Sequence, residues 1–339
     1  MDLAALEINL VTGTFWISLV SFLLFLTSVV TKKDSGKSQI TSQLGFVAMI
    51  LVALTSTGAL VAKAVLTGHV PWSNFYESMI LMTALDAVLF LFIYKSYKHD
   101  LLGVIMSPAI VILVGIASIL PKNFRGNEPL VPALQSYWIK IHTTSMIVSY
   151  SVFLLATTTA IAYLIMYSLT NRSKYLTTEE EARKIKRMSL ASTGPSLGDN
   201  DIAIVANPSI DEKTDTASTS SGKMKFDTER MHTENPHLAF FDDITYRMIL
   251  LGFPILAFGI ITGAMWANHA WGTYWSWDPK ETASLMTWMF YAAYIHTRVS
   301  MNLKGKTSAI LAVVGFAAVI FTYYGVNYLP GLHSYGFAV

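Results

Sequence analysis

The chain has 339 residues, of which 53% are hydrophobic and 14% are charged, and its mean hydropathy is +0.46. A soluble protein of this size needs a more charged exterior, so the composition excludes a soluble globular protein and predicts an integral membrane protein. The net charge of +2 gives no electrostatic footprint for nucleic acid, and the absence of cysteine excludes disulfides, thiolate metal sites and thiol chemistry by this chain.

Apolar stretches of membrane-spanning length recur along the sequence, since about 20 mostly apolar residues cross the hydrocarbon as a helix. Eight are predicted: Ile8 to Thr31, Leu44 to Leu66, Met79 to Tyr94, Leu101 to Leu120, Thr143 to Leu169, Ile244 to Trp266, Ala283 to Ile295 and Thr307 to Tyr324. The first has no small-residue cleavage pattern, so we interpret it as a retained helix and not a signal peptide. The predicted fold class is an all-α integral membrane protein with about eight transmembrane helices.

The distribution of basic residues predicts the orientation of these helices. Eight crossings return the chain to its starting side, and 19 of the 24 Lys and Arg residues fall on the opposite side. Positive charge concentrates on the cytoplasmic side of membrane proteins. Both termini are therefore predicted on the outer, lumenal or periplasmic, side.

The segment from Thr170 to Phe240 interrupts the apolar pattern, with 21 charged residues among 71 and a centre rich in Ser, Thr and Gly. This composition is typical of a flexible loop, here cytoplasmic. It divides the chain into residues 1–169 with helices one to five, the loop at 170–240, and residues 241–339 with helices six to eight.

Four of the eight tryptophans lie within twelve residues, between the sixth and seventh stretches. They are Trp266, Trp271, Trp275 and Trp277. An aromatic belt at the membrane surface is the alternative explanation, but belts are spread around a protein and not confined to one loop. The cluster predicts an apolar indole surface for a large, flat aromatic ligand.

The residues that follow the tryptophans carry a helix-start pattern. Asp278, Pro279 and Glu281 have the spacing of an N-cap, a first-turn proline and the acid of a capping box. Asp278 is therefore predicted to begin the seventh helix, and Lys280 is the better candidate to contact an anionic group on a ligand.

Three features of the predicted outer face are separated by even numbers of crossings: His142, the tryptophan loop and His333. Taken singly, each histidine is interpreted as a surface residue. One imidazole on each side of an iron, with an aromatic surface between them, would make a six-coordinate haem site. Because His142 and His333 share this location with the tryptophan loop, they are the candidate ligands of such a site.

Other ionisable residues have less distinctive settings. His296 lies 18 residues after Asp278, roughly 27 Å along a helix, and is either a histidine stabilised by the helix dipole beside Arg298 or a functional residue at membrane depth. Asp86 falls in mid-span and needs a partner that the sequence does not identify. The remaining histidines, His69, His99, His232, His237 and His269, are interpreted as loop residues, with His269 the first candidate for an exception.

The segment WGTYWSWDPKET resembles the signature of the WWD-domain haem-handling proteins, specifically the CcsA (ResC) family of System II cytochrome c synthase. PWSNFYESM, SYWIKIHTTSMIVSY, AYIHTR and LPGLHSYG are similar to further segments of that family. The resemblance covers the chain outside the loop at 170–240 and fits the cyanobacterial and plastid branch best. Two departures are His269, where relatives usually carry an acid, and the third helix, which lacks an expected LSW near Asp86.

The resemblance implies roles for several residues. His142 and His333 are implied to be paired external haem ligands, and His296 a transmembrane haem ligand whose mate comes from a CcsB (ResB-like) partner subunit. The implied haem-binding set is completed by Trp266, Trp271, Trp275, Trp277, Asp278 and Lys280.

The implied function is cytochrome c biogenesis in a thylakoid or plasma membrane of a cyanobacterium or plastid. Haem b is the substrate, carried across or along the membrane and attached through thioether bonds to the CXXCH motif of apocytochrome c on the outer face. This is cytochrome c haem lyase activity as part of a complex, in which thiol-reducing proteins are further candidate partners.

The sequence leaves three rival functions open. The first is a haem exporter or presenter without synthase activity, similar to the CcmC branch. The second is a b-type electron carrier, which needs histidines paired inside the bilayer. The third is an ion-coupled transporter built around Asp86 and Lys63, which leaves the tryptophan cluster unexplained.

Overall fold

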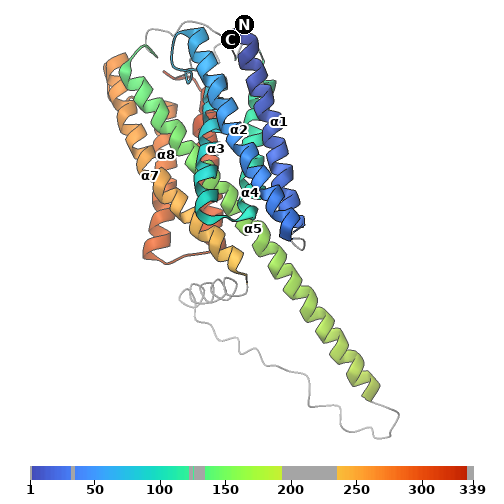
Figure 1. Ribbon diagram of the computed structural model, residues 1–339. Coiled ribbons are helices and arrows are strands. Elements are labelled where there is room, and N and C mark those ends of the chain that lie inside the picture. Colours follow the sequence, from blue (N-terminus) through green and yellow to red (C-terminus); the bar gives the residue numbers. More distant parts are fainter. Residues whose placement is uncertain (1, 32–34, 122–124, 126–133, 193–234, 334–339) are drawn as a thin grey trace.

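A computed structural model of the protein describes residues 2–31, 35–121, 125, 134–192 and 235–333, and these ranges are helical with no strand. The helices are α1 (Leu3–Val30), α2 (Ser35–Thr67), α3 (Phe75–Tyr97), α4 (Asp100–Ile119), α5 (Tyr137–Ser192), α7 (Pro236–Trp271), α8 (Pro279–Ser300), α9 (Lys306–Tyr323) and the 3-10 turn η3 (Gly325–Tyr328). Figure 1 shows them side by side in one bundle, beyond which the C-terminal part of α5 projects. The all-α prediction is confirmed for these ranges.

Seven of the described helices are long and apolar enough to cross a membrane. The remaining predicted stretch, the seventh (Ala283 to Ile295), lies in α8, whose 22 residues reach about 33 Å at 1.5 Å per residue. Although α8 packs along α9 and is long enough to cross the bilayer, it has no 18-residue stretch as apolar as those of the other seven helices. The count of eight crossings therefore stays a prediction.

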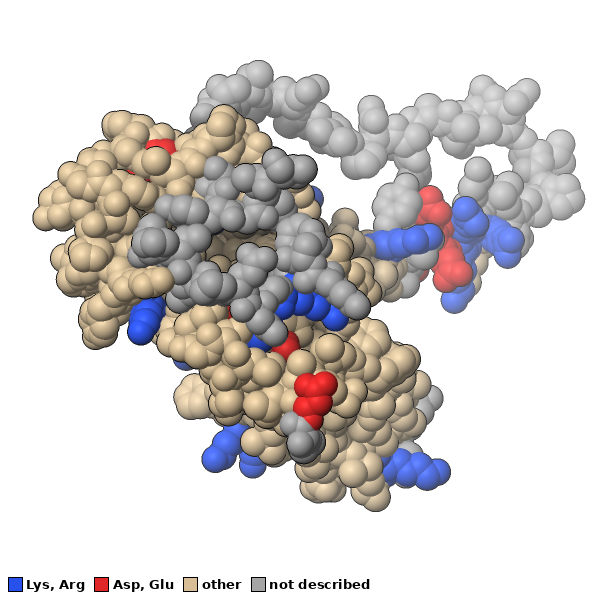
Figure 2. Space-filling model, turned by 90° about the horizontal axis from the view of Figure 1, so that it is seen from above, with Lys and Arg blue, Asp and Glu red and all other residues tan. Residues whose placement is uncertain are grey.

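Two hydrogen bonds bring the beginning of α1 and the end of α9 to the same end of the bundle. The Tyr76 hydroxyl at the start of α3 donates to Glu7 Oε1 at 2.7 Å, and the Ser78 and Tyr323 hydroxyls lie 2.6 Å apart. Viewed from this end, the described surface is mostly uncharged, with a few scattered Lys, Arg, Asp and Glu side chains (Figure 2). Which side of a membrane this end faces stays a prediction.

The predicted loop from Thr170 to Phe240 has different boundaries in the structure. Helix α5 continues through Ser192, and α7 already begins at Pro236 after an N-cap formed by Asn235. The prediction ends each helix where the apolar pattern stops, but charged residues with good helix propensity extend α5 beyond it. Residues 193–234, including His232, lie outside the described ranges, so the flexibility predicted for them is untested.

Helices α5 and α7 approach closely because α7 presents glycines to large side chains of α5. A Cβ at Gly252 would lie 2.7 Å from the Phe153 ring, and a Cβ at Gly259 would lie 2.7 Å from Met146 Sδ. Small residues at a helix interface let two membrane helices pack backbone to backbone. This packing fixes the position of α5 side chains relative to the α7 backbone.

At the opposite end of the bundle, a buried ion pair joins the last three helices. Arg298 Nη1 of α8 donates to Asp242 Oδ1 of α7 at 2.7 Å, and the Gly305 N–H before α9 donates to the same oxygen at 3.1 Å. Both charged side chains are less than one-tenth exposed. Since removing one partner of such a pair leaves a buried charge uncompensated, this contact fixes how α7, α8 and α9 meet.

Asp86 of α3 is fully buried, and among the described residues neither of its carboxylate oxygens makes a hydrogen bond of standard geometry; the Ser151 hydroxyl of α5 is its polar neighbour. An unsatisfied buried polar group costs about 1–3 kcal/mol, whereas an apolar side chain of similar shape does not. We expect Asp86→Leu to raise the free energy of unfolding by about 1–3 kcal/mol, measured by thermal or denaturant unfolding in detergent.

Thr83→Val on the same helix is the matched control for this substitution. Thr83 is equally buried, but its hydroxyl donates to the Met79 carbonyl at 2.9 Å, so its replacement brings no such gain. A destabilised Asp86→Leu protein would contradict the interpretation of Asp86 as an unsatisfied group.

Candidate functional site

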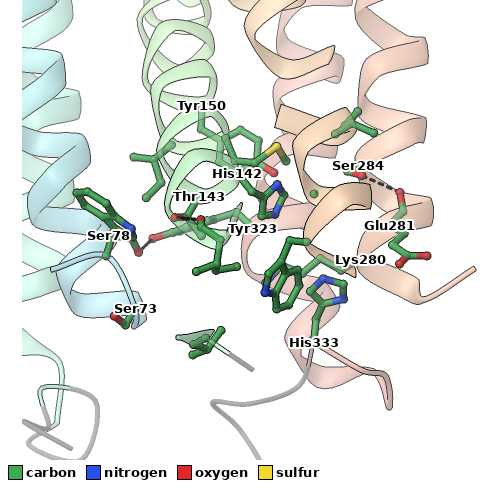
Figure 3. Close-up of a pocket in the computed structure, with 18 of the residues that line it drawn as sticks. Ser73, Ser78, His142, Thr143, Tyr150, Lys280, Glu281, Ser284, Tyr323 and His333 are labelled. Atoms are coloured by element: carbon green, nitrogen blue, oxygen red, sulfur yellow. Dashed lines mark hydrogen bonds between the residues drawn. The ribbon is translucent and has the colours of Figure 1, made fainter. Parts of the chain in front are cut away.

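A cavity of about 250 Å³ opens at the end of the bundle where α5 and α8 begin and α7 ends. Its lining includes Trp72, Ser78, His142, Tyr150, Trp266, Trp275, Lys280, Tyr323 and His333. Figure 3 shows His142, Lys280 and His333 together on one side of this pocket, with Ser78 on the other side. A second cavity of about 760 Å³ adjoins it and shares Trp72 and Thr143 in its lining.

His142 lies in the first turns of α5 and is held against the α7 backbone. Its Nδ1 is 2.8 Å from the Gly259 carbonyl oxygen. Because a carbonyl oxygen accepts and does not donate, Nδ1 must carry the proton. Within the described residues, Nε2 of this ring has no hydrogen-bond partner, so its lone pair is available to a ligand in the pocket.

His333 follows η3 and is held by the residue that begins α8. Its Nδ1 lies 2.7 Å from Asp278 Oδ1, and the preceding Leu332 N–H donates to Asp278 Oδ2 at 2.6 Å. An ionised carboxylate has no proton to donate, so Nδ1–H is again the donor and Nε2 again keeps its lone pair.

The charge states at this contact follow from burial and from neighbouring groups. Burial raises the pKa of Asp278, but hydrogen bonds from the Lys280 N–H, the His333 ring and the Leu332 N–H outweigh it, so the pKa lies below its usual value. Burial lowers the pKa of His333 more than the nearby Asp278 carboxylate raises it. At neutral pH the pair is therefore a carboxylate and a neutral imidazole.

Asp278 also has the capping role that the sequence predicts. Its side chain accepts from the Lys280 N–H at 2.9 Å, and Glu281 reaches back to the Asp278 N–H to complete a capping box. The N-cap prediction is confirmed. The contact with His333 was missed, because a separation of 55 residues gives no local sequence signal.

Trp266 is the indole that contacts both histidines. Its ring is 1% exposed, stacks nearly parallel to His142 with centroids 6.2 Å apart, and lies 5.4 Å from the His333 ring. Trp271 packs edge-on against Trp266 at 4.7 Å and against His333 at 4.9 Å. These two indoles therefore hold the imidazoles in place.

The remaining two tryptophans of the cluster have different positions. Trp275 lines the pocket, whereas Trp277 is 71% exposed and is absent from the lining. Trp277 has a positive φ of 60°, which turns the chain just before the Asp278 cap. The structure brings three of the four predicted indoles to the pocket or to its histidines, and it directs Trp277 outward.

Lys280 is the one Lys or Arg among the described residues that lines this pocket. Its Nζ donates to Asn327 Oδ1 of η3 at 3.2 Å, which holds the ammonium at the wall of the cavity. The prediction that Lys280 contacts an anionic group is compatible with this position and stays a prediction.

His296 lies far from this pocket, near the other end of α8. Its side chain is exposed on the helix surface, and its Nδ1 is 3.3 Å from Ser300 Oγ one turn further on. Since the pocket lies at the start of α8 and His296 near its end, His296 does not share a site with His142 and His333 within this chain.

Sequence reasoning did not assign the opposite wall of the pocket, although it singled out the segment from Pro71 to Met79. Asn74 caps α3 by accepting from the Glu77 N–H at 2.8 Å, and this turn places Trp72, Phe75 and Ser78 in the lining. The cap pattern of Asn followed three residues later by Glu was available in the sequence as a signal.

A histidine pair at the opposite end was also missed. His99 Nε2, at the start of α4, lies 3.1 Å from His237 Nδ1 in the first turn of α7. The sequence interpretation as loop residues is wrong for His237 and for His269, both of which lie in α7.

Comparisons with known proteins agree on one family. The family model described as "Cytochrome C assembly protein" matches residues 72–333. Proteins named "Cytochrome c biogenesis protein CcsA" are similar along nearly the whole chain. The one from Porphyra purpurea is 35% identical over 343 residues, covering 99% of both chains. The one from Nostoc punctiforme is 36% identical and covers 97% of this chain and 99% of its own.

Two further comparisons are consistent with this assignment. The CcsA from Synechococcus elongatus is 36% identical over 345 residues and covers 99% of both chains. Among solved structures, one titled "Cytochrome c Heme Lyase CcmF" has a TM-score of 0.57 at 16% identity, with 96% of this chain matching 47% of that chain. The latter likeness concerns the fold alone. The extent of the family match and the identity to full-length relatives show that this chain belongs to the cytochrome c assembly protein family.

Proposed function

We propose that this protein binds haem between His142 and His333 and presents it for covalent attachment to the CXXCH motif of apocytochrome c. It does so in a complex with a CcsB (ResB-like) subunit, on the outer face of a thylakoid or plasma membrane. The names of the relatives, which come from cyanobacteria and plastid-bearing organisms, support a role in cytochrome c biogenesis.

One observation carries the proposal: two imidazoles that are remote in sequence line the same pocket, and each has Nδ1 engaged by an acceptor. His142 donates to a carbonyl and His333 to a carboxylate, which leaves an Nε2 lone pair on each ring. Neutral imidazoles held by a second hydrogen bond are the usual form of histidine metal ligands. This donor set fits the two axial positions of a haem iron.

The rest of the pocket fits a porphyrin in chemistry and in extent. Trp266, Trp275 and Tyr150 offer aromatic surface, and the Lys280 ammonium offers a partner for a propionate. The adjoining cavity of about 760 Å³ extends the space to a size typical of cofactor sites. Trp271 and Asp278 contribute indirectly: Trp271 packs against the Trp266 ring, and Asp278 accepts a hydrogen bond from the His333 ring.

His296 has a separate role in this proposal. Its exposed position on α8 suits a haem ligand that is completed by a histidine of the partner subunit at membrane depth. Haem then reaches the outer site across or along the membrane, with the two sites at opposite ends of α8.

The chemistry joins two thiols of the apocytochrome to the two vinyl groups of haem. Each S–H adds across a vinyl C=C, so that sulfur bonds to one carbon and the proton ends on the other, with no net oxidation. This chain has no cysteine and contributes by position: it orients the haem, exposes the vinyl edge and provides nitrogen ligands to the iron.

Coexpression with the partner subunit and a CXXCH apocytochrome tests the proposal. We expect the purified complex to have the absorption spectrum of low-spin, six-coordinate haem, and the apocytochrome to acquire covalently bound haem. Bound haem without covalent transfer would favour a haem exporter, whereas a colourless complex would refute haem handling altogether.

The positions of the charged and histidine side chains disfavour an ion-coupled transporter and a b-type electron carrier. Lys63 Nζ lies 5.6 Å from the Tyr76 ring, and Tyr76 and Asp86 are ten residues, or about 15 Å, apart on α3. The two charges of the supposed ion pathway therefore do not meet. A b-type electron carrier needs two histidines facing each other at membrane depth, and His296 has no such mate within the described part of this chain.

A further inference from the structure

The two histidines of the pocket differ in the acceptor that holds them. His333 Nδ1–H donates to a carboxylate, Asp278, at 2.7 Å, whereas His142 Nδ1–H donates to a neutral backbone carbonyl, Gly259, at 2.8 Å. Hydrogen bonds to an ionised acceptor are about twice as strong as those between neutral groups. A carboxylate behind an imidazole also increases the basicity of the other ring nitrogen, and so its strength as a metal ligand.

The Asp278 carboxylate is itself firmly held. Its Oδ1 accepts from the Lys280 N–H at 2.9 Å, and its Oδ2 accepts from the Leu332 N–H at 2.6 Å. The side chain is 2% exposed. Because Leu332 and His333 both bind the same carboxylate, the segment that carries His333 is fixed at two points to the start of α8.

The acceptor of His142 is weaker by the same reasoning. The Gly259 carbonyl lies within α7 and also accepts from the Thr262 hydroxyl at 3.1 Å. Both acceptor oxygens are shared with a second donor, so the difference between them is charge: the carbonyl carries no full charge to polarise the imidazole.

We propose that Asp278 is a positioning residue that makes His333 the retained haem ligand, so that His142 is the ligand that yields its place to the histidine of the incoming CXXCH segment. This inference rests on the proposed function, since it assumes that both imidazoles bind one iron. The two histidines then have different roles. His333 stays bound to the haem iron while the haem is transferred, and His142 binds the iron only until the apocytochrome arrives.

The test compares how well each histidine holds haem alone. In His142→Ala the remaining ligand is His333, and in His333→Ala it is His142. The vacant position is filled with N-methylimidazole, which has no N–H and therefore cannot take over the hydrogen bond to Asp278. We expect half-maximal haem retention at about 10- to 100-fold lower N-methylimidazole in His142→Ala than in His333→Ala.

Asp278→Asn in each background removes the charge of the carboxylate and also the hydrogen bond from the Leu332 N–H, because an amide nitrogen cannot accept. Asparagine has the same shape and is an equally good N-cap, so α8 keeps its start. We expect the ratio of the two N-methylimidazole concentrations, one for each histidine variant, to fall toward one. With both histidines present, we expect Asp278→Asn to raise the midpoint potential of the bound haem, because an anion behind the ligand is lost.

The outcomes separate this inference from the proposed function. Equal retention in the two single variants, better retention in His333→Ala, or a difference that Asp278→Asn leaves unchanged would overturn the inference while haem binding stands. Wild-type protein that holds no haem would instead refute the proposed function.

Discussion

His142→Ala and His333→Ala are each expected to lower haem retention by at least about 100-fold in the complex purified with the partner subunit. Loss of a group that merely supports a ligand costs a metal site about 10- to 100-fold, so loss of the ligand itself costs at least as much. Each substitution removes one Nε2 lone pair from the pocket and leaves the other imidazole in place. Haem absorbance per protein measures the effect, and added imidazole should restore part of it.

His269→Ala is the matched control for both substitutions. His269 lies in the last turn of α7, close in sequence to Trp266 and Trp271, but its side chain is exposed and does not line the pocket. We expect its haem content to equal that of the wild type. Undiminished haem in both His142→Ala and His333→Ala would refute the assignment of the ligands.

The helices were predictable because their signal is local. A stretch of about 20 apolar residues is long enough to span the bilayer as a helix. The bilayer offers no hydrogen-bond partners to backbone polar groups, so such a stretch must form these bonds within itself, as a helix does. Because even numbers of predicted crossings separate His142, the tryptophan loop and His333, the sequence placed all three on the same side. The structure has them at one end of the bundle. Helix α8 has only a short apolar stretch in the sequence, because its 22 residues include polar side chains at both ends.

The contacts that organise the pocket were not predictable from the same sequence. Asp278 meets His333 across 55 residues, and His142 meets the Gly259 carbonyl across 117. Such pairs depend on how α5, α7 and α8 pack, and side-chain packing between distant segments has no periodic signature. The capping role of Asp278 was predictable because its partners are two and three residues away.

The four tryptophans of the cluster are close in sequence, but they do not all face the pocket. Trp266 and Trp271 belong to α7, which ends at Gly272 in the left-handed conformation that favours glycine. Trp275 and Trp277 follow in the connection to α8, where the positive φ of Trp277 turns the chain, so that the two indoles do not share a side. The pattern therefore predicted an indole-rich site, but the backbone decides that Trp277 faces away from it.

Gly263→Ala is expected to lower haem retention by displacing the His142 ring. The absent side chain of Gly263 makes room for His142, since a Cβ at this position would lie 2.7 Å from both Cε1 and Nδ1 of the imidazole. The ring must then move away from α7, which breaks its hydrogen bond to the Gly259 carbonyl and misdirects Nε2. We expect haem retention to fall by about 10- to 100-fold, as for loss of a supporting contact to a metal ligand.

Two opposing terms set the stability of the same variant. Alanine in a helix interior is favoured over glycine by about 0.5–1 kcal/mol, but the broken hydrogen bond leaves the imidazole N–H of His142 without its acceptor, which costs about 1–3 kcal/mol. We therefore expect a net loss of stability, measured by unfolding of the haem-free protein in detergent. Gly13→Ala in α1, where a Cβ would meet nothing within 4 Å, is the control that gains helix propensity and keeps its haem. Gly263→Ala protein with full haem content would show that the close approach of α7 does not set the position of the His142 ring.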